Sequence, residues 1–357
     1  MSENMLADLT TSAVGGPADR LVTAKSEEQL VRAVAEADAE GQQLLLIGGG
    51  SNLVIADAGY RGTAVRIATR GVKITAGRTG YQLVEVAAGE PWDDTVRATL
   101  QAGLSGLEAL SGIPGLTGAT PVQNVGAYGS EVSSVLRSIR AYDRHAGQVV
   151  ELSNEQLSFG YRDSLIKQTS VAGSPRFVVL SVLFELPVDT LSAPIRYAEL
   201  ARQLDVAVGE RAEAEAVRET VLRLRRSKGM VYDVNDPDSH STGSFFTNPI
   251  VDRSVLESLP EGAPNYPVAT EGQVKLSAAW LIDQAGYAKG YGLEGTEGFP
   301  LAQGRASLSS KHTLAVTNRG TASAGDLLAI ARAVRAGVQE RFGILLHNEP
   351  LLIGDSL

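Results

Sequence analysis

The sequence of 357 residues contains no cysteine, and this absence excludes several kinds of chemistry. Disulfide bonds, iron–sulfur clusters, thiolate zinc sites and cysteine nucleophiles all require a side chain that the protein lacks. Histidine is scarce as well, because only His145, His240, His312 and His347 are present, with no pair spaced one helical turn apart. We therefore expect no dedicated metal site.

The chain also has few basic residues and no long apolar run. Its 32 Lys and Arg are outnumbered by 41 Asp and Glu, and the net charge of -9 argues against a nucleic-acid partner. No apolar window approaches the length of a membrane span, and Met1-Ser2-Glu3-Asn4 does not begin a secretion signal. These absences predict a cytoplasmic protein without a membrane partner. We expect it to act as a monomer.

What is present is an ordinary globular composition with both helical and strand patterns. Hydrophobic residues make up 43% of the chain and charged residues 20%, and the length favours two or three domains. Ser26-Glu27-Glu28-Gln29 has the form of a capping box, which predicts a helix that ends near Gly41. The hydrophobic pattern predicts further strands over Leu44–Ile47, Arg176–Leu186, Leu314–Val316 and Leu351–Ile353, and further helices over Pro91–Gln101, Ala212–Lys228, Leu276–Gln284 and Ser323–Phe342.

A first glycine-rich segment directly follows the strand predicted at Leu44–Ile47. It reads Gly48-Gly49-Gly50-Ser51-Asn52, and its successive backbone N–H groups would suit phosphate oxygens. It is not a Walker A loop, because no Gly-Lys-Ser/Thr follows, and Leu53 stands where a Rossmann fingerprint needs its third glycine. A phosphate site and a plain loop both remain open.

A second glycine-rich segment extends from Gly112 to Gly129. A loop of this length inside a compact domain is usually functional, and its apolar content argues that it is ordered. Close backbone approaches with uncharged amides between them suit a large flat ligand that carries a diphosphate. The alternative is an unusually tight core crossover. The residues that we expect to contact such a ligand are Gly115, Gly118, Ala119, Gln123, Asn124, Gly126 and Ala127.

Three separate stretches carry groups that handle a proton or an anion. Gly243–Val251 contains Ser244 between a glycine and two phenylalanines, Phe159–Ser164 contains Arg162, and His347–Pro350 contains Glu349. Each stretch is rich in turn residues. From the residues alone, Ser244 is either a positioned reactive hydroxyl or a capping serine in a core loop.

These motifs occur in one order along the chain and together resemble those of the UDP-N-acetylenolpyruvoylglucosamine reductase family. The resemblance extends roughly from Gly15 to Glu349. It rests on Gly-Gly-Gly-Ser-Asn at 48–52, the loop from Gly112 to Gly129, Tyr161-Arg162-Asp163-Ser164, Gly243-Ser244-Phe245-Phe246-x-Asn248-Pro249 and Asn348-Glu349-Pro350.

The resemblance implies an α+β protein with the FAD-binding fold of the vanillyl-alcohol-oxidase (PCMH) type. In that fold the flavin lies between two α+β subdomains, and a C-terminal α+β domain covers the substrate. On this sequence the FAD-binding subdomains would be residues 1–75, to which 345–357 would return, and residues 76–228. The substrate-binding domain would be residues 229–344.

The resemblance also implies an enzyme, a UDP-N-acetylmuramate dehydrogenase of peptidoglycan synthesis, and thus a role in cell-wall biogenesis, cell shape and division. FAD would be the cofactor, NADPH the co-substrate and UDP-N-acetylenolpyruvoylglucosamine the substrate, in two half-reactions at one site. The family's catalytic roles carry over to three residues. Ser244 would donate the proton, Arg162 would stabilise the charge that spreads into the substrate carboxylate, and Glu349 would be the partner of Arg162.

Binding roles carry over in the same way. Tyr161 would lie beside the catalytic arginine, and Tyr197 would be a mobile tyrosine that closes over the substrate diphosphate. Lys228 and Asn248 would contact the substrate near its pyrophosphate. The flavin would contact Gly48 to Asn52 and the loop from Gly112 to Gly129, mostly through backbone N–H groups.

Two other functions remain open on the sequence alone. One is a different FAD oxidoreductase on the same fold, such as a sugar or alcohol oxidase. The other is a non-redox protein that binds a nucleotide sugar, which would keep the glycine-rich loops but need no flavin.

Overall fold

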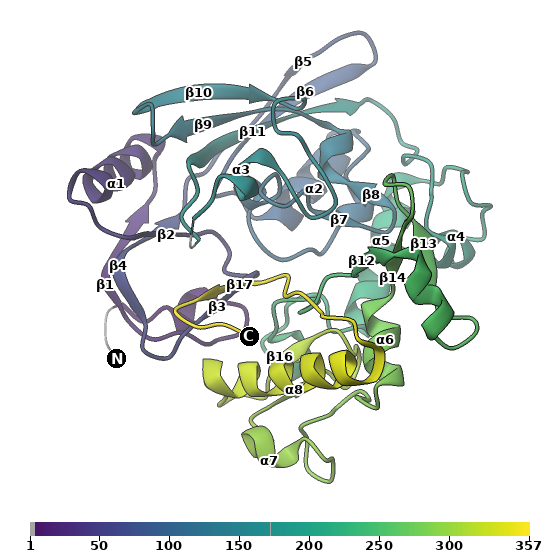
Figure 1. The fold of residues 1–357 in the computed structure, drawn as a ribbon. Coiled ribbons are helices and arrows are strands. Elements are labelled where there is room, and N and C mark those ends of the chain that lie inside the picture. Colours follow the sequence, from purple (N-terminus) through teal and green to yellow (C-terminus); the bar gives the residue numbers. More distant parts are fainter. Residues whose placement is uncertain (1–3, 172) are drawn as a thin grey trace. The chain divides into compact units, whose positions relative to one another are not determined.

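The computed structural model describes residues 4–171 and 173–357 (Figure 1). These residues divide into two compact units: the sheet unit, within residues 18–49 and 61–227, and the carboxyl unit, with residues 4–17, 50–60 and 228–357. Residues 76–227 thus belong to the sheet unit and 229–344 to the carboxyl unit, while the three-domain division itself stays a prediction. Of the segment assessed for a secretion signal, Met1-Ser2-Glu3 lies outside the described residues.

The sheet unit is built on a five-stranded antiparallel sheet in the order β10-β9-β11-β6-β5. Side chains alternate between the two faces of such a sheet. Val86 and its cross-strand partner Val182 are fully buried on one face, in a cluster that includes Trp92 of helix α2. The elements are β5 Val72–Ala76, β6 Tyr81–Ala87, β9 Leu136–Asp143, β10 Gln148–Ser153, β11 Phe177–Pro187 and α2 Trp92–Gln101.

A smaller sheet in the order β1-β4-β2 carries helix α1 (Figure 1). Its strands are β1 Ala18–Ala24, β4 Tyr60–Ile67 and β2 Leu44–Ile47, β2 runs parallel to β4, and α1 is Glu27–Ala39. Leu30 of α1 and Leu44 of β2 lie in one buried cluster. The Gln29 N–H donates to Ser26 Oγ at 3.2 Å and caps the helix as expected. The Gln29 side chain accepts from the Lys25 N–H and not from Ser26, so the expected capping box is only half formed.

Short elements complete the sheet unit. They are β7 Gly126–Ala127, β8 Ser130–Glu131, α3 Leu165–Gln168, α4 Ala198–Gln203 and α5 Ala214–Ser227. Helices α4 and α5 pack together through Leu200, Val217 and Val221, whose side chains are almost completely buried. The last turn of α5 carries Arg225 and Arg226, where cations favour the carboxyl end of a helix.

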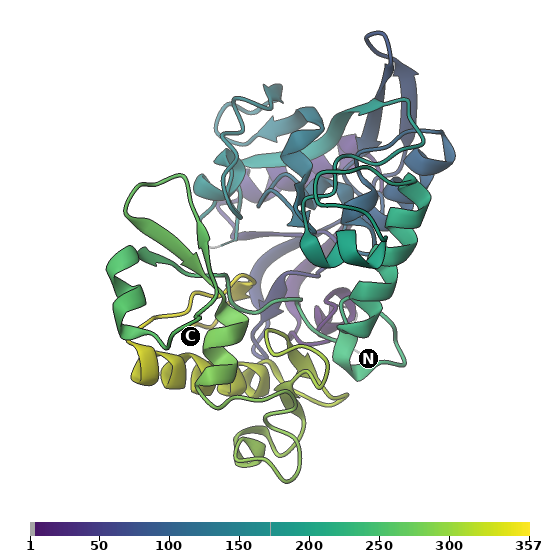
Figure 2. The same ribbon diagram turned by 90° about the vertical axis from the view of Figure 1, so that its right-hand side faces the viewer.

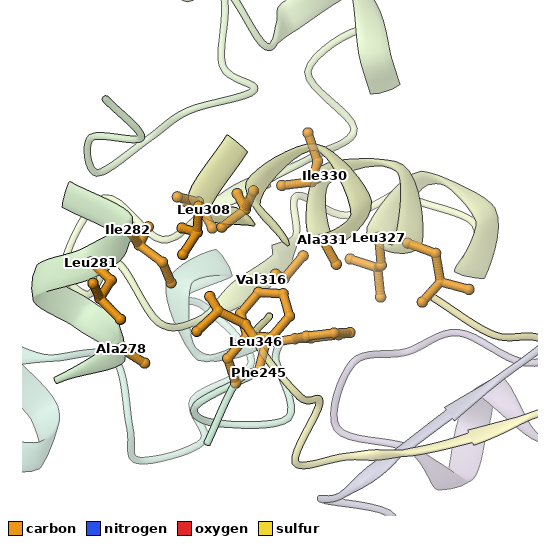
Figure 3. Close-up of a cluster of buried hydrophobic side chains, with 14 of the residues drawn as sticks. Phe245, Ala278, Leu281, Ile282, Leu308, Val316, Leu327, Ile330, Ala331 and Leu346 are labelled. Carbon is orange, nitrogen blue, oxygen red and sulfur yellow. The ribbon is translucent and has the colours of Figure 1, made fainter. Parts of the chain in front are cut away.

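The carboxyl unit packs three helices and several short strands around one apolar core. Figure 3 shows Phe245, Val316 and Leu346 within this core, and α6 lies beside α8 (Figure 2). Strand β17 pairs in parallel with β3. The elements are β3 Leu53–Ile55, β12 Ile250–Asp252, β13 Asn265–Pro267, β14 Gln273–Leu276, β15 Ala306–Leu308, β16 Val316–Asn318, β17 Leu351–Ile353, α6 Ala278–Gln284, α7 Phe299–Ala302 and α8 Ala324–Phe342.

Most predicted elements are confirmed, and the errors fall at element ends. The strand predicted at Leu314–Val316 begins only at Val316, because the Ala315 N–H donates to the His312 carbonyl in a turn. The helix predicted from Leu276 begins at Ala278, since Leu276 closes β14 and Ser277 caps the helix. The final strand, β17, does return to residues 1–75, where it pairs with β3 in a separate two-stranded sheet and does not join the β1-β4-β2 sheet.

Within the described residues, no helix combines the length and apolarity that a membrane span requires. The same residues contain no group of three or more histidine, aspartate or glutamate side chains that could hold a metal ion.

Candidate functional site

In the sheet unit, the start of the first glycine-rich segment touches the second. A Cβ added to Gly49 would lie 2.6 Å from the Gly115 Cα, a distance that real Cβ atoms essentially never show. Gly115 is itself held by the first turn of α2, because its carbonyl accepts the Trp92 N–H at 3.0 Å. Only glycine at position 49 therefore lets these two backbones approach so closely.

The second segment continues along the end of β6. The Gly118 N–H donates to the Ala88 carbonyl at 2.9 Å, and a Cβ on Gly118 would lie 2.5 Å from the Ala88 Cβ. The Thr117 hydroxyl, 2.9 Å from that of Thr95, joins the segment to α2. Glycine and other small residues thus leave no bulky side chain between the backbones where the two segments meet.

A partly buried ion pair fixes the beginning of the second segment. The Asp93 carboxylate accepts hydrogen bonds from Nη1 and Nη2 of Arg218, each at 2.7 Å, and from the Gly112 N–H at 2.6 Å. Burial alone raises the pKa of Asp93, but the hydrogen bonds from Arg218 and Gly112 outweigh burial and leave the pKa below its ordinary value. The carboxylate is therefore charged at neutral pH and clamps the loop between α2 and α5.

The last turn of α5 carries a second arginine, Arg225, which stays charged in a desolvated setting. Burial lowers the pKa of Arg225 to about 10, while attraction to Tyr128 and Asp93 acts in the opposite direction. At neutral pH the guanidinium remains protonated. Arg225 therefore brings a positive charge close to Tyr128, near the end of the second glycine-rich segment.

Arg162 lies at the tip of a tight turn in the sheet unit. The Gly160 N–H donates to the Asp163 carbonyl at 3.0 Å, which closes the turn, and Arg162 has the left-handed φ of +54°. Its guanidinium donates to the Gly126 carbonyl at 2.9 Å and lies 5.5 Å from the centre of the Tyr161 ring. Arg162, which we expect to be catalytic, and Tyr161, which we expect to bind substrate, thus lie close together. The second glycine-rich segment binds the Arg162 guanidinium through Gly126.

The side chain of Asn124 forms hydrogen bonds to other groups of the protein. Its amide donates to Glu131 at 2.9 Å and to the Gly160 carbonyl at 3.1 Å, and its oxygen accepts the Ser133 N–H at 3.2 Å. The side chain is buried. Asn124 therefore ties the second glycine-rich segment to the turn that carries Arg162, a structural role that the expected flavin contact did not anticipate.

In the carboxyl unit, the Ser244 loop lies against the segment that carries Glu349. The Glu349 N–H donates to the Phe245 carbonyl at 2.9 Å, and the Thr247 N–H donates to the His347 carbonyl at 3.0 Å, although these partners are about a hundred residues apart. Phe245 and Phe246 are 1% and 2% exposed and anchor the loop in the core. Ser244 itself is half-buried.

Glu349 is also bound to the end of the first glycine-rich segment. The Asn52 side chain donates to the Glu349 carbonyl at 3.3 Å, and the Leu351 N–H donates to the Asn52 carbonyl at 2.9 Å. Gly50 packs so tightly that a Cβ would lie 1.8 Å from the Leu9 carbonyl oxygen. Ser244, Glu349 and residues 50–52 therefore form one connected cluster in this unit.

The remaining residues that we expect to bind substrate are distributed over both units, with Lys228 and Asn248 in the carboxyl unit and Tyr197 in the sheet unit. Asn248 Oδ1 accepts the Ala278 N–H at 3.0 Å, so this side chain is engaged at the start of α6. Lys228 directly follows α5, and Gly229 behind it packs against Asp238. Tyr197 precedes α4 in the sheet unit and is 43% exposed.

Known proteins are similar to this chain in sequence and in fold. The family model described as "UDP-N-acetylenolpyruvoylglucosamine reductase, C-terminal domain" matches residues 236–353, and the model described as "FAD binding domain" matches residues 18–153. The UDP-N-acetylenolpyruvoylglucosamine reductase of Streptomyces coelicolor is 53% identical over 99% of this chain and 90% of its own length. The protein of that name from Salinispora arenicola is 49% identical over 100% of this chain and 96% of its own length. The chain belongs to the UDP-N-acetylenolpyruvoylglucosamine reductase family.

A solved structure extends the relationship to three dimensions. The UDP-N-acetylenolpyruvylglucosamine reductase from Thermus caldophilus matches with a TM-score of 0.62 and 26% identity, over 98% of this chain and 97% of its own. The protein is thus an FAD-dependent oxidoreductase of the α+β class that the sequence predicted. Membership in the reductase family decides against the sugar oxidase and the non-redox alternatives.

FAD suits the glycine-rich segments of the reductase. Gly49 lets the first segment pack against Gly115, Gly118 lets the second pack against Ala88, and a glycine-rich backbone held in this way is suited to a cofactor diphosphate. Residues 48–49 and the segment from Gly112 to Gly129 would hold the cofactor in the sheet unit. Gly50 to Asn52 would do so in the carboxyl unit.

We expect Gly49→Ala to weaken FAD binding at least about tenfold, because the new methyl group would overlap the Gly115 backbone and push the two segments apart. The measurement is the dissociation constant of FAD from the apoprotein, followed by the quenching of flavin fluorescence. Gly48→Ala is the matched control, since its Cβ would make an ordinary contact with Leu116 at 3.7 Å. Equal losses in both variants would contradict packing between the segments as the cause.

The sequence missed the residues that support the site. Asp93 and Arg218 are ordinary helix positions in the sequence, and only the fold joins them to Gly112. Tyr128 was part of the glycine-rich segment but was not assigned a role. Its position between two glycine-rich dipeptides, Gly126-Ala127 and Gly129-Ser130, was the available signal for a tight turn.

Proposed function

We propose that this reductase uses NADPH and FAD to convert UDP-N-acetylenolpyruvoylglucosamine to UDP-N-acetylmuramate, with Ser244 as the proton donor. The observation that carries the proposal is the pairing of the Ser244 loop with the Glu349 segment, through the hydrogen bond from Glu349 N–H to the Phe245 carbonyl. This hydrogen bond joins the backbones of the two distant segments that carry Ser244 and Glu349, which supports a role for both residues in one reaction. The relatives' printed name supports the same substrate.

Reduction of the enol ether adds a hydride to the terminal vinyl carbon and a proton to the neighbouring carbon. FAD, when bound and reduced, would supply the hydride. The carbon–carbon π bond breaks, and its electron pair moves onto the neighbouring carbon and into the attached carboxylate. The protein must therefore hold the carboxylate, stabilise its extra charge and deliver one proton to a defined carbon.

Ser244 would deliver that proton. A hydroxyl is a weak acid, but an enediolate is basic enough to accept its proton when the geometry is fixed. The flanking phenylalanines are almost fully buried and support such a fixed geometry. Once the proton has left Ser244 Oγ, the serine must regain one from solvent before the next turnover.

Arg162 would stabilise the charge on the substrate carboxylate. A guanidinium offers parallel N–H donors that match the two oxygens of a carboxylate. The hydrogen bond to the Gly126 carbonyl fixes one of its nitrogens and orients the group. Glu349 would assist as a protonated acid or beside a cation, because a bare carboxylate would oppose the developing charge.

The other assignments concern the nucleotide. Tyr161 would bind next to Arg162, and Tyr197 would close over the diphosphate. Lys228 and Asn248 would contact the pyrophosphate region. We further propose that the enzyme acts as a monomer in the cytoplasm, without nucleic-acid or membrane partners, and that NADPH and the sugar nucleotide use one site in turn.

The test is an anaerobic titration of the purified protein. NADPH should bleach the visible flavin absorption, and UDP-N-acetylenolpyruvoylglucosamine should then restore it with formation of UDP-N-acetylmuramate, identified by mass. NADH in place of NADPH measures the choice of reductant. A flavin that NADPH reduces but the enolpyruvyl substrate does not reoxidise would overturn the proposed reaction.

A further inference from the structure

A strained hairpin stands at the end of the second glycine-rich segment. Strands β7 and β8 are joined by Tyr128 and Gly129 alone, because Ala127 pairs with Ser130. Both loop residues have positive φ, +50° for Tyr128 and +80° for Gly129. Such turns favour Asn-Gly or Asp-Gly, and a tyrosine at the first position costs conformational energy. A strained side chain of this kind points to a role for its ring.

The Tyr128 ring lies against Tyr197. The two rings meet edge to face with their centres 5.5 Å apart and their planes at 89°. A Cβ on Gly129 would lie 3.1 Å from the Arg196 Cβ, so the tip of the hairpin also touches the backbone next to Tyr197.

The two tyrosines differ in how firmly they are held. Tyr128 packs against the apolar cluster between α4 and α5, whereas Tyr197 is 43% exposed. Tyr128 is therefore the fixed partner, and Tyr197 is the one that has room to move.

The other end of the hairpin holds Arg162. The Gly126 carbonyl accepts from the Arg162 guanidinium, and a Cβ on Gly126 would lie 3.2 Å from its Nη1. Asn124 fixes the same region through Glu131 of β8 and through the Gly160 carbonyl. Hairpin β7–β8 is thus in direct contact with both Arg162 and Tyr197.

We propose that Tyr128 is a positioning residue whose ring holds the Tyr197 ring in place. Hairpin β7–β8 connects this contact between the two rings to Arg162. The inference rests on the proposed function, in which Tyr197 closes over the substrate diphosphate and Arg162 binds the substrate carboxylate. The hairpin then fixes the spacing between the sites for the carboxylate and the diphosphate of the substrate. Tyr128 acts through Tyr197 and need not touch the substrate.

The experiment is a double-mutant cycle on the FAD-loaded enzyme, with the binding of UDP-N-acetylmuramate measured by titration calorimetry. Tyr128→Leu should raise its Kd about three- to tenfold, as expected for the loss of one aromatic pair. Tyr128→Phe keeps the ring and should stay within about twofold of the parent protein. The double variant Tyr128→Leu/Tyr197→Leu should bind no more weakly than Tyr197→Leu alone, because Tyr197→Leu already removes the ring that Tyr128 holds in place.

Three outcomes would overturn the inference, and they are distinguishable. Additive effects of the two substitutions would show that Tyr128 acts independently of Tyr197, and the proposed function would stand. An unchanged Kd in the Tyr197→Leu variant would refute both the proposed role of Tyr197 in binding and the proposed role of Tyr128 in positioning it. A weaker FAD affinity of the Tyr128→Leu apoprotein, measured by fluorescence quenching, would show that Tyr128 supports the cofactor loop instead.

Discussion

Ser244→Ala leaves the reduction of bound FAD by NADPH intact and slows its reoxidation by UDP-N-acetylenolpyruvoylglucosamine by roughly 10²- to 10⁴-fold, the usual contribution of a positioned general acid. The two half-reactions separate because only the second one needs a proton at a substrate carbon. The substitution removes one oxygen from a half-buried side chain, and Phe245 and Phe246 still anchor the loop. Stopped-flow absorbance of the flavin measures both steps in one preparation.

Thr247→Val is the matched control for Ser244→Ala. It removes a hydroxyl from the same loop, one that donates only to the His347 carbonyl at 3.3 Å, and it keeps the backbone hydrogen bond to that carbonyl. Its reoxidation rate should stay close to that of the parent protein. Ser244→Cys retains a proton donor and should recover part of the lost rate. Unimpaired reoxidation in Ser244→Ala would refute the assignment of the serine as general acid.

The local order of the chain was largely predictable because it depends on short-range rules. Ser26 and Ser323 cap their helices through side-chain oxygens, and such caps are visible in a few consecutive residues. The apolar run at Leu44–Ile47 predicted β2 for the same reason. The glycine-rich segments were also visible as candidates for a diphosphate ligand, since glycine density reports directly on backbone access.

The connections between distant segments could not be predicted in this way. Nothing near Phe245 in the sequence indicates that its carbonyl accepts the Glu349 N–H, because that pairing is set by the packing of the whole carboxyl unit. Likewise, the sequence cannot show that Asp93 receives Arg218 from α5. The family resemblance supplied the identities of Ser244 and Glu349, and the fold supplied the physical reason that they lie together.

Asn124 illustrates the limit of reasoning from composition. An amide in a glycine-rich loop is a reasonable ligand contact, yet all three of its hydrogen bonds go to Glu131, Gly160 and Ser133. Asn124 also has a positive φ of +46°, so the chain turns at this residue. Composition reveals neither this turn nor the three hydrogen bonds, and the expected contact between the flavin and Asn124 stays a prediction.

Arg162→Lys is expected to slow the reoxidation of the flavin by the enolpyruvyl substrate by about 10²-fold, and Arg162→Met by about 10³-fold, while NADPH still reduces the flavin. Lysine keeps the charge but loses the planar fork and cannot both donate to the Gly126 carbonyl at 2.9 Å and grip a carboxylate with parallel bonds. The loss should appear in kcat and in kcat/KM together, because the extra charge on the carboxylate exists only as the reaction proceeds.

The position of Arg162 on a tight turn calls for a control that disturbs the turn and spares the guanidinium. Lys167→Met provides it, since the Lys167 ammonium donates to the Arg162 carbonyl at 2.7 Å from an exposed position. Lys167→Met should keep the reoxidation rate within about threefold of the parent value, as is usual for exposed polar contacts. If it were as slow as Arg162→Lys, the geometry of the turn and not the guanidinium would account for the rate. If Arg162→Met reoxidised at the parent rate, the charge on the substrate carboxylate would have to be stabilised by another group.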